Sequence, residues 1–259
     1  SPTTHTMDQC IKEILIGSNP LNIEDLWTKM YVGKAMTGRR GAGINAMSAI
    51  DMALWDIKGK YENKPVFELI GGKKQDYVVP YASLQPIGHS FQEYKDSLVA
   101  WAIKAKDLGF KAVKSEVTLN GPYAHSGLNE NDERTTEVVA AVRNALGPEI
   151  KLMIDVQYRW HDAQAALKTV KDWGEYDIYF LETPVWTDDI KSYARMHDEA
   201  PMKIAAGEWL STKYEFEDLI VNGKIDVAQP DIGRCGGLTE ALKIAEFSQL
   251  HNRIIVPHC

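Results

Sequence analysis

Several features that define other classes of protein are missing from this 259-residue sequence. It contains no apolar run of the roughly 18 residues that a membrane-spanning helix needs. Its first ten residues, SPTTHTMDQC, lack the basic and apolar regions of a secretory signal. The three cysteines, Cys10, Cys235 and Cys259, are too few and too far apart for a disulfide framework, so we expect reduced thiols. These absences lead us to expect a cytoplasmic protein with no membrane partner.

A basic surface for nucleic acid is also missing. Lys and Arg total 29 against 36 Asp and Glu, which gives a formal net charge of −7, and no segment carries a basic stripe. Nucleic acid is therefore not expected as a partner. An anionic substrate would have to be met by a local cation or a metal ion. The GxSxG pattern of many hydrolases is absent as well.

The sequence does contain a change of pattern near residue 78. Residues 1–77 show helical periodicity, most clearly over 45–61. From Val78 onward, seven short apolar runs alternate with amphipathic stretches, of which 92–108, 132–145, 163–173 and 238–251 have helical spacing. The seven runs are VVPYASL, FKAVKSEV, KLMIDV, IYFLETP, KIAAGE, DVAQPDI and RIIVPH. This α/β alternation predicts a parallel sheet covered by helices, either doubly wound or a (β/α) TIM-type barrel.

The position of polar residues favours the barrel. Asp155, Glu182, Glu208 and Asp231 each follow one of four successive strands, and His258 ends the next strand. The steps between them are 27, 26, 23 and 27 residues, each about one βα unit. In a parallel barrel all strand carboxyl ends open onto one face, so these residues would converge there.

Three of these acids form a candidate metal site. Asp155, Glu182 and Glu208 would repel one another if they converged without a cation between them. Ligation by oxygen alone suits Mg²⁺, with Mn²⁺ as a substitute. Any one acid at a strand end could simply cap the following helix, but three acids in register are better explained by a shared ion.

Asp231 and His258 form a candidate catalytic pair. They follow adjacent strands, so a carboxylate and an imidazole can be hydrogen-bonded there, with the acid orienting the ring. His258 would then serve as general acid or base. Lys114 and Glu116 lie two apart on an earlier strand and so share one face. Lys114 is either a surface lysine or a cation that holds a substrate carboxylate, and Glu116 is a second candidate for substrate binding.

Together these residues resemble the mandelate racemase branch of the enolase superfamily. The resemblance rests on NPLNIEDLW, AMSAIDMALWDIKGK, VFELIGG, AVKSE, LMIDV, FLETP, AAGE, QPDIGRCGGLTEALKIA and VPH, which span nearly the whole chain. It implies metal-assisted removal of the proton α to a carboxylate, with Asp155, Glu182 and Glu208 as ligands. It also implies the Asp231 and His258 pair.

Within that branch the sequence looks most like dehydratases of acid sugars such as L-rhamnonate. The resemblance thus implies a small-molecule acid sugar as substrate, Mg²⁺ as cofactor, loss of the β-hydroxyl to give a 2-keto-3-deoxy acid, and a homo-oligomer. Gln157, two residues after Asp155, and Trp209, next to Glu208, are further candidates for substrate binding. Trp209 stands where relatives of this kind tend to have histidine, so the resemblance does not identify the sugar.

The sequence departs from the branch in two respects. Glu116 stands where many members have a second catalytic lysine, which argues against a racemase, an epimerase or a lysine-based cycloisomerase. A racemase or epimerase of the family and a non-catalytic metal-binding scaffold remain the alternatives. Residues 1–77 would be the helical remainder of an N-terminal capping domain and 78–259 an incomplete barrel, so we expect this chain to be part of a longer protein.

Overall fold

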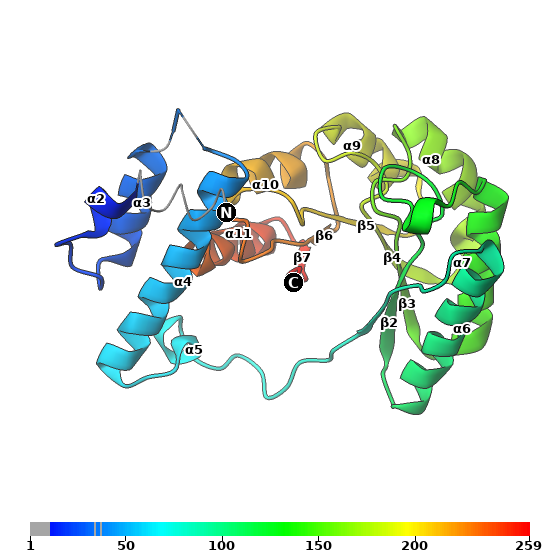
Figure 1. Cartoon of the computed structure of the whole chain (residues 1–259), viewed down its shortest axis with the longest axis horizontal. Coiled ribbons are helices and arrows are strands. Elements are labelled where there is room, and N and C mark those ends of the chain that lie inside the picture. Colours follow the sequence, from blue (N-terminus) through cyan, green and yellow to red (C-terminus); the bar gives the residue numbers. More distant parts are fainter. Residues whose placement is uncertain (1–10, 34, 37) are drawn as a thin grey trace. The chain divides into compact units, whose positions relative to one another are not determined.

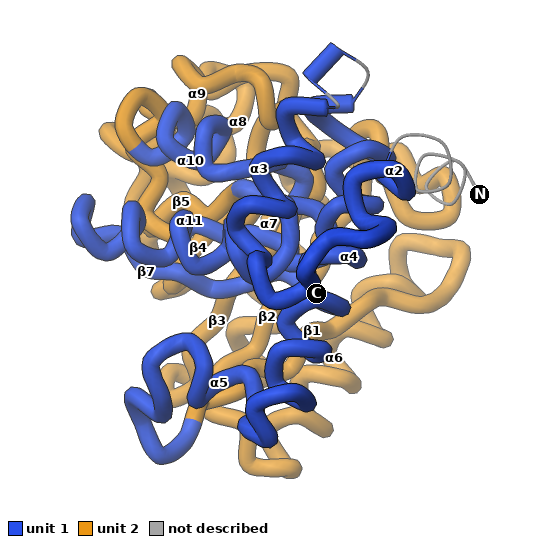
Figure 2. The backbone as a smooth tube through the Cα atoms, turned by 90° about the vertical axis from the view of Figure 1, so that its left-hand side faces the viewer, with its two compact units in different colours: residues 1–77, 207–220, 228–259 blue, residues 78–206, 221–227 orange. Residues whose placement is uncertain are grey.

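The structure is a computed structural model that describes residues 11–33, 35–36 and 38–259. The predicted thiol Cys10 lies outside the described residues, whereas Cys235 is buried and Cys259 is exposed, and both are free. Contacts divide the chain into two units (Figure 2). Unit 1 contains residues 1–77, 207–220 and 228–259, and unit 2 contains 78–206 and 221–227. The assignment of 1–77 to a capping domain and of 78–259 to an incomplete barrel stays a prediction.

Unit 2 is built on parallel strands. β1 (Ala82–Leu84), β2 (Ala112–Glu116), β3 (Lys151–Asp155), β4 (Ile178–Glu182) and β5 (Lys203–Ala206) pair in sequence order. Its helices are α6 (Phe91–Asp107), α7 (Asp132–Leu146), α8 (Ala163–Val170) and α9 (Ile190–Glu199), with short 3₁₀ segments η2 (His125–Gly127) and η3 (Lys171–Tyr176). Figure 1 shows α6, α7 and α8 on one side of β2 to β4. The apolar residues on the helix-covered face of these strands are thereby shielded from water.

The helices of unit 2 begin where the sequence supplies a cap. Ser90 precedes α6, and its hydroxyl accepts the backbone N–H of Glu93. The Glu93 carboxylate in turn accepts the backbone N–H of Ser90. At the starts of α7 and α8, the side chains of Asn131 and Asp162 accept the N–H groups of Arg134 and Ala165. Each cap satisfies backbone N–H groups that have no partner inside the helix.

Unit 1 contains most of the helical N-terminal part of the chain. Its helices are α2 (Lys12–Leu15), α3 (Ile23–Gly33), α4 (Ala42–Glu62), α5 (Val66–Leu69), α10 (Thr212–Val221), whose last residue falls in unit 2, and α11 (Leu238–Leu250). Leu26 and Met30 of α3 pack with Ile44 and Met47 of α4 in a core of fully or nearly fully buried side chains. The helical spacing of these apolar residues puts them on one face of each helix.

Two very short strands complete the sheet. β6 (Val227–Ala228) falls at the boundary between the units and β7 (Ile254–Ile255) lies in unit 1. The Asp226 N–H donates to the Ile204 carbonyl, and the Val256 N–H donates to the Ala228 carbonyl. The strand order is therefore β1-β2-β3-β4-β5-β6-β7, which confirms the seven strands predicted and the barrel-type α/β class. All seven apolar runs of the sequence contain one of them.

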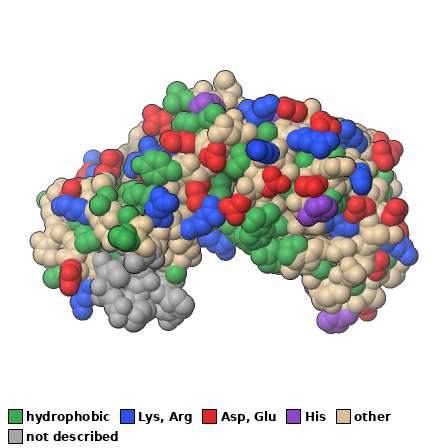
Figure 3. Space-filling view, turned by 90° about the horizontal axis from the view of Figure 1, so that it is seen from above, with side chains coloured by type: hydrophobic (Ala, Val, Ile, Leu, Met, Phe, Trp, Pro, Cys, Tyr) green, Lys and Arg blue, Asp and Glu red, His purple; other side chains and the backbone are tan. Residues whose placement is uncertain are grey.

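Two surface properties bear on the predicted partners. No helix in the part of the chain that the structure describes is long and apolar enough to cross a membrane. On the face shown in Figure 3, Lys and Arg side chains are interspersed with Asp and Glu. This face therefore shows no extended area of positive charge of the kind that binds nucleic acid.

Candidate active site

Three acids of unit 2 lie in register at the carboxyl ends of neighbouring strands. Glu116 of β2 pairs with Asp155 of β3, and Asp155 pairs with Glu182 of β4. Residues paired across a sheet point their side chains to the same face, so the three acids share one face. Asp155 and Glu182 are buried, with 5% and 0% exposure, whereas Glu116 is half-buried.

Lys114 lies between two of these carboxylates. Its Nζ atom is 2.7 Å from Oε1 of Glu182 and 3.8 Å from Oδ2 of Asp155. Burial alone would lower the pKa of the Lys114 ammonium, but the attraction of Glu182 and Asp155 outweighs it and raises the pKa above its ordinary value. Lys114 is thus a buried permanent cation and not the surface lysine of the alternative interpretation.

The Asp155 carboxylate is fixed by its neighbours on the following loops. Its Oδ1 atom accepts the Gln157 N–H at 3.0 Å and the Thr183 hydroxyl at 3.0 Å. Gln157, Tyr158 and Thr183 all have positive φ, between 42° and 60°. Non-glycine residues adopt this conformation at a cost, and such strain is concentrated at binding and catalytic sites.

Glu116 is held differently. Its Oε1 atom accepts the Thr118 hydroxyl at 3.2 Å, and its backbone carbonyl accepts the Tyr94 hydroxyl at 3.0 Å. Glu116 therefore lies on the same face as Lys114 but has its own hydrogen-bond donor. This placement is compatible with the predicted contact to substrate.

Unit 1 holds the second group of predicted residues. Nδ1 of His258 lies 3.0 Å from Oδ2 of Asp231, and Nε2 of His258 lies 3.1 Å from Oε2 of Glu208. The hydrogen bond to Glu208 raises the pKa of His258, burial lowers it, and Asp231 raises it again, so that the net shift is upward. The imidazole is therefore placed between two acids that favour its protonated form.

Backbone contacts bring Asp231 and His258 together. The two residues form a parallel bridge, and the His258 N–H donates to the Pro230 carbonyl at 3.1 Å. Glu208 is buried, and the adjacent Trp209 is half-buried. The structure thus places Asp231 beside His258, as the spacing predicted, while their chemical roles stay predictions.

Whether a metal ion fits this chain depends on the side chains that could act as its ligands. Among residues 11–33, 35–36 and 38–259, no group of three or more Asp, Glu, His or Cys side chains is arranged so that it could hold a metal ion. The donor chemistry does fit, because Asp155 and Glu182 are buried carboxylates that both approach a single cationic atom. Glu208, the third predicted ligand, is also a buried carboxylate, and it lies in unit 1. Oxygen ligands of this kind suit Mg²⁺.

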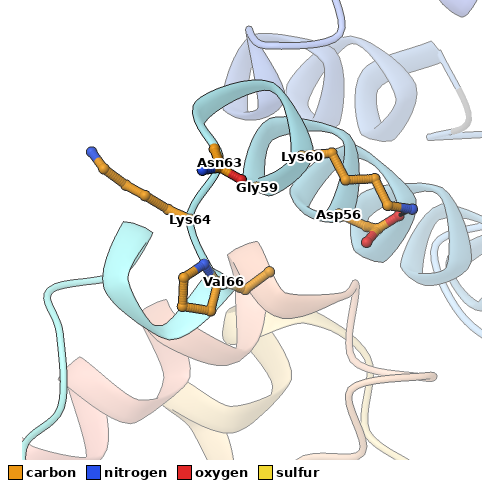
Figure 4. Close-up of a pocket in the computed structure, with 7 residues that line it drawn as sticks. Asp56, Gly59, Lys60, Asn63, Lys64 and Val66 are labelled. Carbon is orange, nitrogen blue, oxygen red and sulfur yellow. Dashed lines mark hydrogen bonds and ion pairs between the residues drawn. The ribbon is translucent and has the colours of Figure 1, made fainter.

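The described surface also has a pocket away from these residues. It has a volume of about 340 Å³ and lies in unit 1, at the C-terminal end of α4, lined by Asp56, Gly59, Lys60, Asn63, Lys64, Pro65 and Val66. Figure 4 shows Lys60 lying beside Asp56, with which it forms an ion pair, and Lys64 pointing away. None of the predicted site residues lines this pocket.

The fold and these residues define a class of protein with parallel βα units, whose acids and histidine lie at the carboxyl ends of the strands. Residues 97–259 match the family model described as enolase C-terminal domain-like, and residues 3–71 match that of the mandelate racemase / muconate lactonizing enzyme N-terminal domain. The chain belongs to the mandelate racemase branch of the enolase superfamily. This confirms the resemblance predicted from the motifs.

Curated relatives include enzymes of two reaction types. The chain is 33% identical to the D-galactarolactone cycloisomerase of Agrobacterium fabrum, over 94% of this chain and 61% of the relative. It is 30% identical to the L-rhamnonate dehydratase of Saccharopolyspora erythraea, over 99% and 61%. It is 31% identical to the D-galactonate dehydratase of Pectobacterium atrosepticum, over 96% and 63%. The chain thus spans about three-fifths of the length of these relatives.

Solved structures of related proteins are also similar to this chain. The 3,6-anhydro-D-galactonate cycloisomerase of Zobellia galactanivorans is 35% identical with a TM-score of 0.87, covering 100% of this chain and 68% of that one. A racemase from Streptomyces coelicolor A3(2) with bound magnesium is 29% identical with a TM-score of 0.87, covering 99% and 72%. The relatives are therefore enzymes that include acid-sugar dehydratases and cycloisomerases.

Proposed function

We propose that this protein is a Mg²⁺-dependent hydro-lyase of acid sugars, which removes the proton α to the substrate carboxylate and expels the β-hydroxyl. The product would be a 2-keto-3-deoxy acid. The observation that carries the proposal is the buried group of Lys114, Asp155 and Glu182 at the carboxyl ends of paired strands. The identity to two acid-sugar dehydratases supports it.

Asp155, Glu182 and Glu208 would hold the magnesium ion. When bound, Mg²⁺ acts as a Lewis acid that makes the α-proton of a bound carboxylate more acidic. Lys114 would place its ammonium group against the substrate carboxylate, because it is buried and stays charged beside two acids. Glu116, Gln157 and Trp209 would contact the rest of the sugar chain.

His258 would move the protons. Asp231 accepts a hydrogen bond from Nδ1 of His258, which fixes the orientation of the ring. Nε2 is then the atom that takes up the α-proton or delivers a proton to the departing hydroxyl. The raised pKa of His258 favours the second of these roles, because a larger fraction of the ring is protonated near neutral pH.

A cycloisomerase of sugar-acid lactones is the second candidate. The 33% identity to the D-galactarolactone enzyme favours it. Against it stands Glu116 at the position where a second lysine base is common in this family. The two reactions are told apart by their substrates, because a dehydratase releases water from an open-chain acid, whereas a cycloisomerase rearranges a lactone without loss of water.

The test is a screen of the protein with Mg²⁺ against aldonic acids, aldaric acids and their lactones, with products followed by NMR. We expect a 2-keto-3-deoxy acid from at least one open-chain acid. His258→Asn should abolish turnover while leaving the Mg²⁺-induced rise in thermal midpoint intact, and exposed His161→Asn should change neither. Absence of ketone from every open-chain acid, or turnover by His258→Asn, would contradict the proposal.

A further inference from the structure

The loop that carries Asp231 is fastened at its far end to helix α4. We call residues 231–237, between β6 and α11, the 231–237 loop. The Gly236 N–H donates to the Ser48 hydroxyl at 3.0 Å, and the Gly236 carbonyl accepts the Trp27 indole N–H at 2.7 Å. Both partners come from the N-terminal helices α3 and α4. Trp27 is 5% exposed and Ser48 is fully buried.

Asp51 of α4 holds Thr239, the second residue of α11, just beyond the loop. Its carboxylate accepts the Thr239 N–H at 2.9 Å and the Thr239 hydroxyl at 2.5 Å. Asp51 is fully buried, and a Cβ atom at Gly237 would collide with its carboxylate. Asp51 therefore fits against the start of α11 so closely that a side chain at residue 237 is excluded.

The near end of the 231–237 loop is the catalytic candidate itself. Oδ1 of Asp231 accepts the Gly233 N–H at 2.7 Å, and its backbone carbonyl accepts the Cys235 N–H at 2.7 Å. The remaining carboxylate oxygen, Oδ2, faces Nδ1 of His258. A shift of Gly236 would therefore be passed through a tight seven-residue loop to the Asp231 carboxylate.

We propose that Ser48 and Asp51 are positioning residues for His258. Neither is within the group of residues that we place at the substrate. They hold the 231–237 loop to α4, so that Asp231 stays against the imidazole and fixes its orientation. The catalytic consequence of this inference rests on the proposed role of His258 in proton transfer, whereas its structural consequence can be measured without any substrate.

The chain offers a matched control for Ser48. Ser248 of α11 is also fully buried, and its hydroxyl donates to the carbonyl four residues earlier at 2.7 Å, as Ser48 does at 2.8 Å. Only the Ser48 hydroxyl also accepts a hydrogen bond from the 231–237 loop. Ser48→Ala and Ser248→Ala thus remove the same group from the same kind of site, and they differ in the contact to the loop.

The experiment records the imidazole N–H proton of His258 by NMR in the whole chain, with the resonance assigned by its loss in His258→Asn. We expect Ser48→Ala to shift or broaden this resonance, while Ser248→Ala leaves it at the wild-type position. Asp51→Asn, which replaces one acceptor oxygen at Thr239 by an amide, should move it as well. An unshifted resonance in both Ser48→Ala and Asp51→Asn would overturn the inference.

Steady-state kinetics then separate positioning from binding. We expect Ser48→Ala to lower kcat by about tenfold with KM unchanged. A small displacement of a catalytic group slows the chemical step but leaves substrate binding intact. Ser248→Ala should keep the wild-type kcat. If the NMR resonance moves but no acid sugar is turned over by the wild type, the proposed function fails and the positioning role stands. If kcat is the same in both variants, the positioning role fails and the function stands.

Discussion

In unit 2, Asp155 and Glu182 end strands that are hydrogen-bonded to their neighbours residue by residue, whereas in unit 1, Asp231 and His258 lie on loops beyond strands of only two residues. Asp155 and Glu182 are the last residues of β3 and β4. Asp231 and His258 each lie three residues past the end of β6 and β7. The sheet ladder therefore places the first pair, whereas the second pair is joined by an isolated backbone bridge and the loop that carries Asp231 is also held by side chains of α3 and α4.

The two groups also differ in the cation that the acids face. In unit 2 it is Lys114, a buried ammonium that stays charged through the physiological range. In unit 1 it is His258, whose charge changes near neutral pH. One group therefore holds a fixed charge, whereas the charge of the other changes with pH, as the proposed proton-transfer role of His258 requires.

The largest expected effect is that of removing the fixed cation. Lys114→Met would leave Asp155 and Glu182 buried without their partner, and breaking a buried ion pair from one side typically costs about 3 to 5 kcal/mol. We expect the free energy of unfolding in urea to fall by this amount. Exposed Lys151→Met, at the start of β3, should change it by less than about 1 kcal/mol. Equal losses in the two variants would show that Lys114 is not a buried counter-charge.

The next largest effect tests how tightly the 231–237 loop packs against α4. Gly237 has a φ of 88°, and Asp51 occupies the space where its Cβ would lie. Gly237→Ala should therefore lower the free energy of unfolding by about 2 to 3 kcal/mol, through backbone strain and overpacking together. Gly17 has a φ of 79°, but no atom lies within 4 Å of the position that a Cβ would take there, so Gly17→Ala should cost only about 1 kcal/mol from strain. Equal costs would mean that the loop is not packed tightly against α4.

The smallest effect concerns the side-chain hydrogen bonds of Asp132 in unit 2. Asp132 of α7 accepts hydrogen bonds from Arg159 at 2.6 Å and from Thr169 at 2.7 Å. Burial raises the pKa of Asp132, but the hydrogen bonds from Thr169 and Arg159 outweigh it, so the pKa is lowered from its ordinary value of 3.8. A lowered pKa means that the stabilisation is complete above pH of about 4 and is lost as the pH falls further.

Asp132→Asn should therefore reduce the free energy of unfolding by about 1 kcal/mol at pH 7, a small value because the carboxylate is 38% exposed. The difference from wild type should shrink as the pH falls below about 4. Asp56→Asn, which removes an exposed pair with Lys60, is the control and should have little effect at either pH. A loss at Asp132 that does not depend on pH would contradict the assigned cause.

Much of the fold could be predicted because alternation of apolar runs and amphipathic stretches is a local property. All seven strands, and the helices α4, α6, α7, α8 and α11, follow from it. The helices α9 and α10 were not predicted. α9 has only ten residues, of which Ser192, Tyr193 and Met196 are buried, so few apolar positions mark it in the sequence.

The acids and His258 could be predicted from their regular spacing, but the means of holding them could not. Ser48 and Gly236 are 188 residues apart, and no sequence period relates them. Thr183 follows Glu182 directly in the sequence, and its hydroxyl donates to the Asp155 carboxylate. Only the register of β3 and β4 brings the Thr183 hydroxyl to Asp155. Long-range side-chain contacts of this kind depend on the folded topology and leave no local signal.

The most direct test of the account is the thermal midpoint of the protein with and without millimolar Mg²⁺. A ligand that binds only the native state raises the midpoint. We predict a rise for the wild type and none for Glu208→Gln, which removes one of the three proposed oxygen ligands. An unchanged midpoint for the wild type, or an equal rise in Glu208→Gln, would contradict the claim that Asp155, Glu182 and Glu208 share a metal ion.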